Sequence, residues 1–267
     1  MDNRKDIQGS LFRPPSTLLR GPPCYEPHTP WGPALALLAT FLIVAASVGI
    51  AAGLVIWLGT ATDGPVELPG RGLARGEASA AMRIFAVWQI SVVVLVVLAA
   101  TRGGVRRVLA LHPVPGGWRT MVLAVVLLWV LQIAFTAFQH IIIRHDITAD
   151  LRVFYELIRG PDWLLTAAVI GLGAAFSEEL LFRGFLQSAL ARTSLGYWGA
   201  AAITTGLWTA LHIGYSAVGI IDVFLMGLFF SWLLWRTGSL WVTIFCHALY
   251  NSLIVLVLRF VDLPAPG

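Results

Sequence analysis

Ionisable and amide side chains interrupt the apolar segments in the C-terminal half of the chain. These residues are Glu178, Glu179, Arg183, His212, Asp222, His247 and Asn251. Charged and strongly polar groups are costly inside a bilayer, and they usually mark a functional site. The apolar segments of the N-terminal half carry almost none, apart from His140. We therefore expect the chemistry to lie in the last four apolar segments.

The spacing of four of these residues predicts that they meet. If segments 163–192 and 198–214 form an antiparallel hairpin that turns near Leu195, Glu178 and His212 lie equally far from the turn and at equal depth. His247 lies about ten residues into the last segment, or about 15 Å deep at the helical rise. Asn251 follows it at i+4 and so shares its face.

A carboxylate, two imidazoles and a carboxamide in one buried pocket favour hydrolysis. A buried carboxylate can take a proton from water, and a neutral imidazole beside it can share that role or hold the water. A second imidazole and an amide can stabilise a developing oxyanion, because hydrogen bonds are strong where the dielectric constant is low. Glu178, His212 and His247 could instead ligate a divalent metal such as zinc, whose bound water would attack. The residue types fit both mechanisms.

The elements that must position these residues are membrane helices. The chain has 267 residues, of which 58% are hydrophobic and only 12% are charged, and this is too apolar for a soluble domain. Its apolar residues form seven segments, at 34–58, 83–100, 120–143, 163–192, 198–214, 217–235 and 239–260. We predict an all-α polytopic membrane protein with about seven transmembrane helices, within a range of six to eight because the fifth and sixth segments are short.

The predicted organisation has four parts. Residues 1–33 are rich in proline and are expected to form a disordered cytoplasmic tail. Residues 34–160 would form a three-helix transmembrane scaffold, residues 161–260 the catalytic transmembrane domain, and residues 261–267 a short tail. The distribution of arginines favours a cytoplasmic N-terminus, in a plasma-membrane protein. The basic residues form no stripe, so we expect membrane lipid as a partner and no nucleic acid.

Three short motifs resemble those of a known family. Glu178-Glu179-Leu-Leu-Phe-Arg183 resembles the EExxxR motif of the CPBP family, which contains the CAAX-prenyl-protease and bacteriocin-processing, or Abi, proteins. Trp208-Thr-Ala-Leu-His212 is similar to its second motif, an aromatic residue followed four positions later by His. His247-Ala-Leu-Tyr-Asn251 is similar to its HxxxN motif. The three occur in the order typical of the family.

The resemblance implies an intramembrane endopeptidase. By that likeness Glu178 and His212 would activate water, while His247 and Asn251 would stabilise the oxyanion. Its substrate would be a membrane-anchored protein or peptide, either prenylated or bearing a leader. Both metal-dependent and metal-free glutamate mechanisms have been argued for the family, so the resemblance leaves the metal open.

The resemblance also assigns a supporting role to Glu179 and Arg183. They would form an ion pair that orients the site, and their i,i+4 spacing favours such a pair on physical grounds as well.

Two other classes of function remain open from the sequence. A proton-coupled transporter could use Glu178, His212 and Asp222 as a relay, although no internal repeat supports that class. A non-catalytic membrane scaffold or immunity protein is the other alternative. Other membrane-protease chemistries fit poorly, since no HExxH motif occurs and Ser216 lies in a weak context for a nucleophile.

Overall fold

A computed structural model describes residues 18–61, 75–146, 148–160 and 162–263. These residues form helices and turns with no β-strand, and six of the helical stretches are long and apolar enough to cross a membrane. The six are Pro33–Trp57, Ala80–Gly103, Trp118–Ile143, Trp163–Leu190, Ala217–Thr237 and Leu240–Phe260. The prediction of an all-α integral membrane protein is confirmed.

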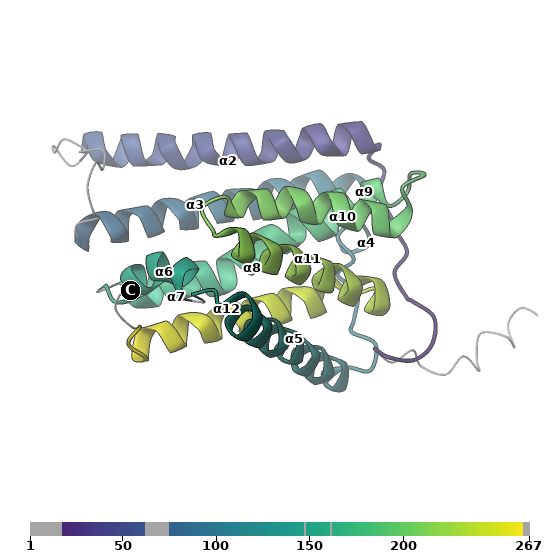
Figure 1. Cartoon of the computed structure of the whole chain (residues 1–267). Coiled ribbons are helices and arrows are strands. Elements are labelled where there is room, and N and C mark those ends of the chain that lie inside the picture. The colour runs from purple at the N-terminus through teal and green to yellow at the C-terminus, as the bar shows by residue number, and fades with distance from the viewer. Residues whose placement is uncertain (1–17, 62–74, 147, 161, 264–267) are drawn as a thin grey trace, which may run out of the picture.

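Three long helices form the N-terminal part of the bundle. Helix α2 (Pro33–Ala61) lies at one edge and packs against α3 (Arg75–Ala100), as Figure 1 shows. The short elements η1 (Thr101–Gly103) and α4 (Val105–Val108) then lead to α5 (Trp118–Phe138) and the π-helical turn η2 (Gln139–Ile143). Large apolar side chains such as Phe41 and Leu98 are exposed on the outer faces, as expected where a helix meets lipid tails.

The fourth span is the most buried and is not a uniform α-helix. It consists of α7 (Trp163–Ala167), the π-helical η4 (Ala168–Gly173), α8 (Ala174–Glu178), the π-helical η5 (Glu179–Leu186) and α9 (Gln187–Leu190). It is preceded by η3 (Ala149–Leu151) and α6 (Arg152–Ile158). π-Helical turns break the regular hydrogen-bond ladder and are frequent at functional sites. The Glu178-Glu179 pair lies at the junction of α8 and η5.

The fifth apolar segment differs from the expected full span. It forms α10 (Gly196–Thr209) and the 3-10 turn η6 (Ala210–His212), after a turn that ends at Leu195 as predicted. The 14 residues of α10 and the 3 of η6 extend about 27 Å and are fewer than the roughly 20 residues that usually cross a hydrocarbon core of about 30 Å. Helices α11 (Ala217–Thr237) and α12 (Leu240–Phe260) then form a hairpin that turns at Gly238, whose φ is +63°. Six long spans result, at the low end of the expected range.

Residues 18–32 form an ordered strap across one end of the bundle, which corrects the expectation of disorder for this stretch. Arg236 Nε donates to the carbonyl of Leu18 at 2.8 Å, and Ser188 Oγ donates to the carbonyl of His28 at 3.1 Å. The edge of the Tyr25 ring meets Tyr197 at 5.2 Å. Prolines prevent a helix here, but they leave backbone carbonyls free to accept such bonds. Residues 1–17 of the expected tail lie outside the described residues.

The strap gives the protein a predicted sensitivity to alkali. Burial raises the pKa of Tyr25 from its ordinary value of 10.0 to about 12. Because the folded state favours the neutral phenol, this contribution to stability is complete below pH 10 and is lost as the pH rises through 12. We expect Tyr25→Phe to lose less stability between pH 8 and pH 11 than the unmodified protein. Thermal unfolding at the two pH values measures this difference, and equal losses in both proteins would contradict it.

Candidate active site

Glu178 lies where three helices meet. Its Oε2 accepts a hydrogen bond from Trp208 Nε1 of α10 at 2.5 Å, and the same oxygen lies 4.0 Å from His247 Nε2 of α12. Glu178 is 9% exposed and His247 is 4% exposed. The hairpin of the fourth span with α10 therefore brings a carboxylate and an indole together, and α12 adds an imidazole.

Glu179 holds the other side of the same imidazole. Its Oε1 lies 3.0 Å from His247 Nδ1 and accepts a hydrogen bond from Arg183 Nη1 at 3.1 Å. The Glu179 and Arg183 side chains are both fully buried. A carboxylate beside a guanidinium is an acceptor, so this contact places a proton on Nδ1 and turns Nε2 toward Glu178. His247 is thus held between two acidic residues that are adjacent in sequence.

Aromatic rings fix the orientation of these polar groups. Phe230 of α11 stacks on the His247 ring at 5.1 Å, and the Trp208 ring meets His247 at 5.8 Å. The Arg183 guanidinium lies 4.2 Å from the centre of the Trp208 ring, within cation–π range. Sequence reasoning gave Trp208 no role. Its position one helical turn before His212 could have placed it on the same face as that histidine.

His212 borders this cluster. It is half-buried, and its Nδ1 lies 3.2 Å from the carbonyl of Trp208. Its ring packs between Trp208 and Tyr215, with centroid distances of 5.1 and 5.3 Å. Trp208 therefore links His212 to Glu178, because its indole N–H donates to Glu178 and its backbone carbonyl contacts His212.

Asn251 and Asp222 have other partners. Asn251 Nδ2 donates to the carbonyl of Ile170 in η4 at 3.0 Å, so its amide is anchored to a π-helical turn of the fourth span. Asp222 accepts a hydrogen bond from Gln132 Nε2 at 3.1 Å, and Tyr250 donates to Gln132 Oε1 at 3.1 Å. Of the sequence-predicted site residues, Glu179 directly contacts Arg183 and His247. Glu178 lies 4.0 Å from His247.

Residues outside the cluster fix the loop that follows His212 through hydrogen bonds to Ser216. Ser216 Oγ caps α11 by accepting from the backbone N–H of Gly219 at 3.0 Å. Asp150 accepts hydrogen bonds from both the backbone N–H and the hydroxyl of Ser216, each at 2.7 Å. These bonds fix the end of the loop that carries Tyr215, the ring that covers His212.

The donor set does not fit a metal ion. Across residues 18–61, 75–146, 148–160 and 162–263, no group of three or more His, Cys, Asp or Glu side chains is placed to hold one. The three ligands considered from sequence, Glu178, His212 and His247, are not such a group.

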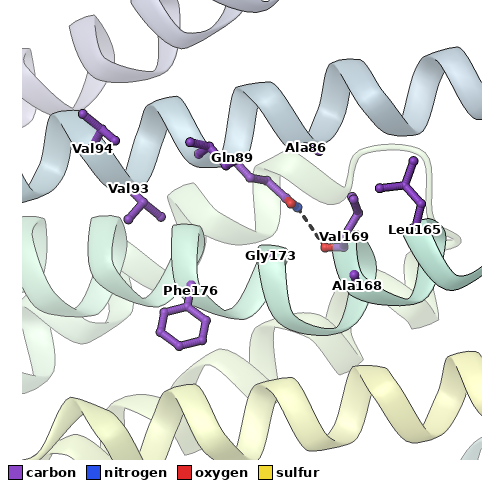
Figure 2. A pocket seen from close by; sticks show the side chains of 10 residues that line it. Ala86, Gln89, Val93, Val94, Leu165, Ala168, Val169, Gly173 and Phe176 are labelled. Atoms are coloured by element: carbon purple, nitrogen blue, oxygen red, sulfur yellow. Dashed lines mark hydrogen bonds between the residues drawn. The ribbon is translucent and has the colours of Figure 1, made fainter.

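An apolar cavity of about 400 Å³ lies next to the fourth span and is open to the outer face of the bundle, where Ile90 and Val94 of its lining are exposed. It is formed by α3 and the segment from α7 to α8, and Figure 2 shows Phe176, Val93 and Val94 around it. Gln89 supplies a polar group and donates from Nε2 to the carbonyl of Val169 at 3.1 Å. Phe176 precedes Glu178 by two residues, so the cavity and the polar cluster share one helix.

Gly227 of α11 allows the close approach that seats Arg183 and Trp208. A Cβ atom at this position would lie 2.7 Å from Arg183 Nη2 and 2.9 Å from Trp208 Cε3. We expect Gly227→Ala to lower the free energy of unfolding by about 1–3 kcal/mol because the overpacked side chains must move. Gly206→Ala in α10 is the matched control, since nothing lies within 4 Å of its added Cβ. Thermal unfolding compares the two variants, and equal midpoints would contradict the prediction.

Comparison with known proteins gives matches over the helices that carry these residues. Residues 160–253 match the family model described as Type II CAAX prenyl endopeptidase Rce1-like. The chain is 34% identical over 92 residues to the "Uncharacterized protein YpbD" of Bacillus subtilis (strain 168). That match covers 32% of this chain and 42% of the relative, so the chain spans less than half of the length of this curated relative. No solved structure matches the chain. The resemblance to the CAAX-protease family is confirmed over this region.

Proposed function

We propose that the chain is an intramembrane endopeptidase that hydrolyses a peptide bond of a membrane-associated protein or peptide. The observation that carries the proposal is the 4.0 Å approach of Glu178 Oε2 to His247 Nε2, with both side chains buried among apolar helices. The family match over residues 160–253 supports the same activity. A separation of 4.0 Å is longer than a direct hydrogen bond, and one water molecule can bridge the two groups.

In this proposal Glu178 is the general base. It takes a proton from water as the water oxygen forms a bond to the carbonyl carbon of the substrate. His212 orients the water, because its Nδ1 faces the Trp208 carbonyl and its Nε2 remains available as an acceptor. Glu178 then returns the proton to the leaving nitrogen as the C–N bond breaks.

The oxyanion would be stabilised by groups on α12. With Nδ1 held by Glu179, a proton on His247 Nε2 gives an imidazolium between two carboxylates, and Nε2 then donates to the oxyanion. Asn251 lies one turn further, with one amide hydrogen committed to Ile170 and a second hydrogen left for the same oxyanion. Glu179 and Arg183 position His247 and do not touch the substrate.

The apolar cavity supports a lipid-bearing substrate. Its lining is hydrocarbon apart from the amide of Gln89, which suits an acyl or isoprenoid chain attached to a peptide. We therefore propose a membrane-anchored substrate, either prenylated or carrying an apolar leader.

The contacts of the strap support the proposed orientation. Arg102 lies 5.3 Å from the Trp31 ring, and Arg192 and Arg236 donate to carbonyls of the strap. Several arginines therefore gather at the strap end of the bundle, as is typical of a cytoplasmic face. We propose a cytoplasmic N-terminus in the plasma membrane, a scaffold over residues 34–160 and a catalytic domain over residues 161–260.

A reconstituted cleavage assay tests the activity. The purified full chain in lipid vesicles is mixed with a farnesylated CAAX peptide and with the same peptide lacking the lipid, and mass spectrometry identifies the products. We expect cleavage that favours the lipidated peptide and requires Glu178. Uptake of a labelled solute that requires Glu178, without cleavage of either peptide, would overturn the proposal in favour of transport.

A further inference from the structure

Several hydroxyl groups on the helices of this protein donate a hydrogen bond to a backbone carbonyl of their own helix. Thr40, Ser177 and Thr204, among others, donate to the carbonyl four residues earlier in their own helix, at 2.8–2.9 Å. Such bonds satisfy a buried hydroxyl locally. The buried hydroxyls of Thr205 and Thr209 in α10 have no hydrogen-bond partner among the described residues. The hydroxyl of Ser47, in the distant α2, also has none.

Further unpartnered polar atoms lie on the helix that faces α10. Arg183 Nε and Nη2 and Gln187 Nε2 are buried and have no hydrogen-bond partner among the described residues. Arg183 and Gln187 lie one turn apart along the fourth span, and α10 packs against both η5 and α9. Gly227 of α11 brings the two sides together, because a Cβ there would lie 2.7 Å from Arg183 Nη2 and 2.6 Å from Thr205 Cγ2.

We call these atoms the polar seam: Arg183 and Thr205 both approach Gly227, while Gln187 and Thr209 lie one turn from them along the fourth span and α10. Its members are Arg183, Gln187, Thr205 and Thr209. Leaving a buried donor without a partner costs about 1–3 kcal/mol, more for a charged group. Internal water is the usual partner of such groups in folded proteins, and each molecule makes about three hydrogen bonds.

We propose that the seam binds ordered internal water, held by Arg183 and Thr205 and extended by Gln187 and Thr209. Thr209 precedes His212 by three residues, so the bound water lies along the helix that leads to the candidate active site. This binding site is separate from the proposed hydrolysis and requires no catalytic step.

The proposal is tested by whether Thr205→Val lowers or raises the melting temperature. Thr205→Val keeps the shape of the side chain and removes the hydroxyl. If the hydroxyl binds water, the variant should lower the melting temperature by about 2–4 °C, as expected for one lost hydrogen bond in a chain of this size. Thr204→Val is the matched neighbour, and it should lower the midpoint because Thr204 is bonded to Gln187. An unchanged or raised midpoint in Thr205→Val would overturn the proposal, since removal of an unpartnered buried hydroxyl relieves a cost.

Radiolytic labelling tests it in the unmodified protein. An X-ray pulse converts bound water into hydroxyl radicals that oxidise the side chains beside it. Phe230 and Phe185 are both fully buried, but Phe230 lies 5.8 Å from the Arg183 guanidinium while Phe185 packs on Trp31. We expect Phe230 to be oxidised several-fold faster than Phe185, and equal rates would overturn the proposal.

The labelling also separates this proposal from the proposed function. Phe230 also stacks on His247 at 5.1 Å, so water in the active site would oxidise it as well. Thr205→Val removes a member of the seam and no residue of the proposed hydrolysis, so Phe230 should be less reactive in this variant than in the unmodified protein. Unchanged Phe230 reactivity in Thr205→Val would show that the water belongs to the active site and would overturn the seam.

Discussion

Replacing Glu178 by Gln is expected to lower kcat for peptide cleavage by about 10²–10⁴-fold, the usual contribution of a general base. The amide keeps the size of the side chain, and its oxygen can still accept the hydrogen bond that Trp208 donates to Oε2. It cannot take a proton from water. The fold should therefore survive while turnover is lost.

The measurement is steady-state cleavage of the lipidated peptide, with thermal unfolding as the check on folding. Glu156→Gln is the matched control, because Glu156 is an exposed glutamate of α6 outside the cluster. It should leave both kcat and the unfolding midpoint unchanged. If Glu178→Gln retained full activity, Glu178 would not be the base.

Replacing Arg183 by Met is expected to lower the free energy of unfolding by about 3–5 kcal/mol. Arg183 and Glu179 are both fully buried and are joined at 3.1 Å. Removing the guanidinium leaves the fully buried Glu179 carboxylate without its cationic partner, and the contact of its Oε1 with His247 Nδ1 remains. The Trp208 ring also loses the cation that lies 4.2 Å above it.

A double variant shows whether the loss comes from an uncompensated charge. Glu179→Gln combined with Arg183→Met removes both charges, so it should recover much of the stability that Arg183→Met alone loses. Denaturant unfolding in detergent measures all three variants. An Arg183→Met protein as stable as the unmodified chain would show that the pair contributes nothing to folding.

The parts of the site that depend on helical spacing could be predicted from the sequence. The i,i+4 interval of Glu179 and Arg183 indicated their ion pair, and the turn near Leu195 placed Glu178 opposite α10. Membrane spans were also predictable, because hydropathy alone separates them from the linkers. Which residues carry out a reaction stays a prediction.

The particular atoms that meet between distant helices could not be predicted, because spacing gives depth but not rotation about the helix axis. The bond of Glu179 to His247 joins the fourth span to α12 and depends on how η5 is wound. The π-helical turns change that winding, and no periodicity in the sequence reveals them. They also give Asn251 the Ile170 carbonyl as a partner, where sequence reasoning placed its amide beside the oxyanion alone.

The shortness of α10 has a consequence for the surrounding lipid. The 14 residues of α10 and the 3 of η6 together extend about 27 Å, which gives this side of the bundle less apolar height than an average bilayer. Ile213, directly after the last turn, is 88% exposed. We expect lipids at this flank to thin or tilt to meet the protein, which would bring the headgroup layer and its water nearer to His212. A depression of the membrane surface at this point would shorten the path of any soluble molecule to the interior of the bundle.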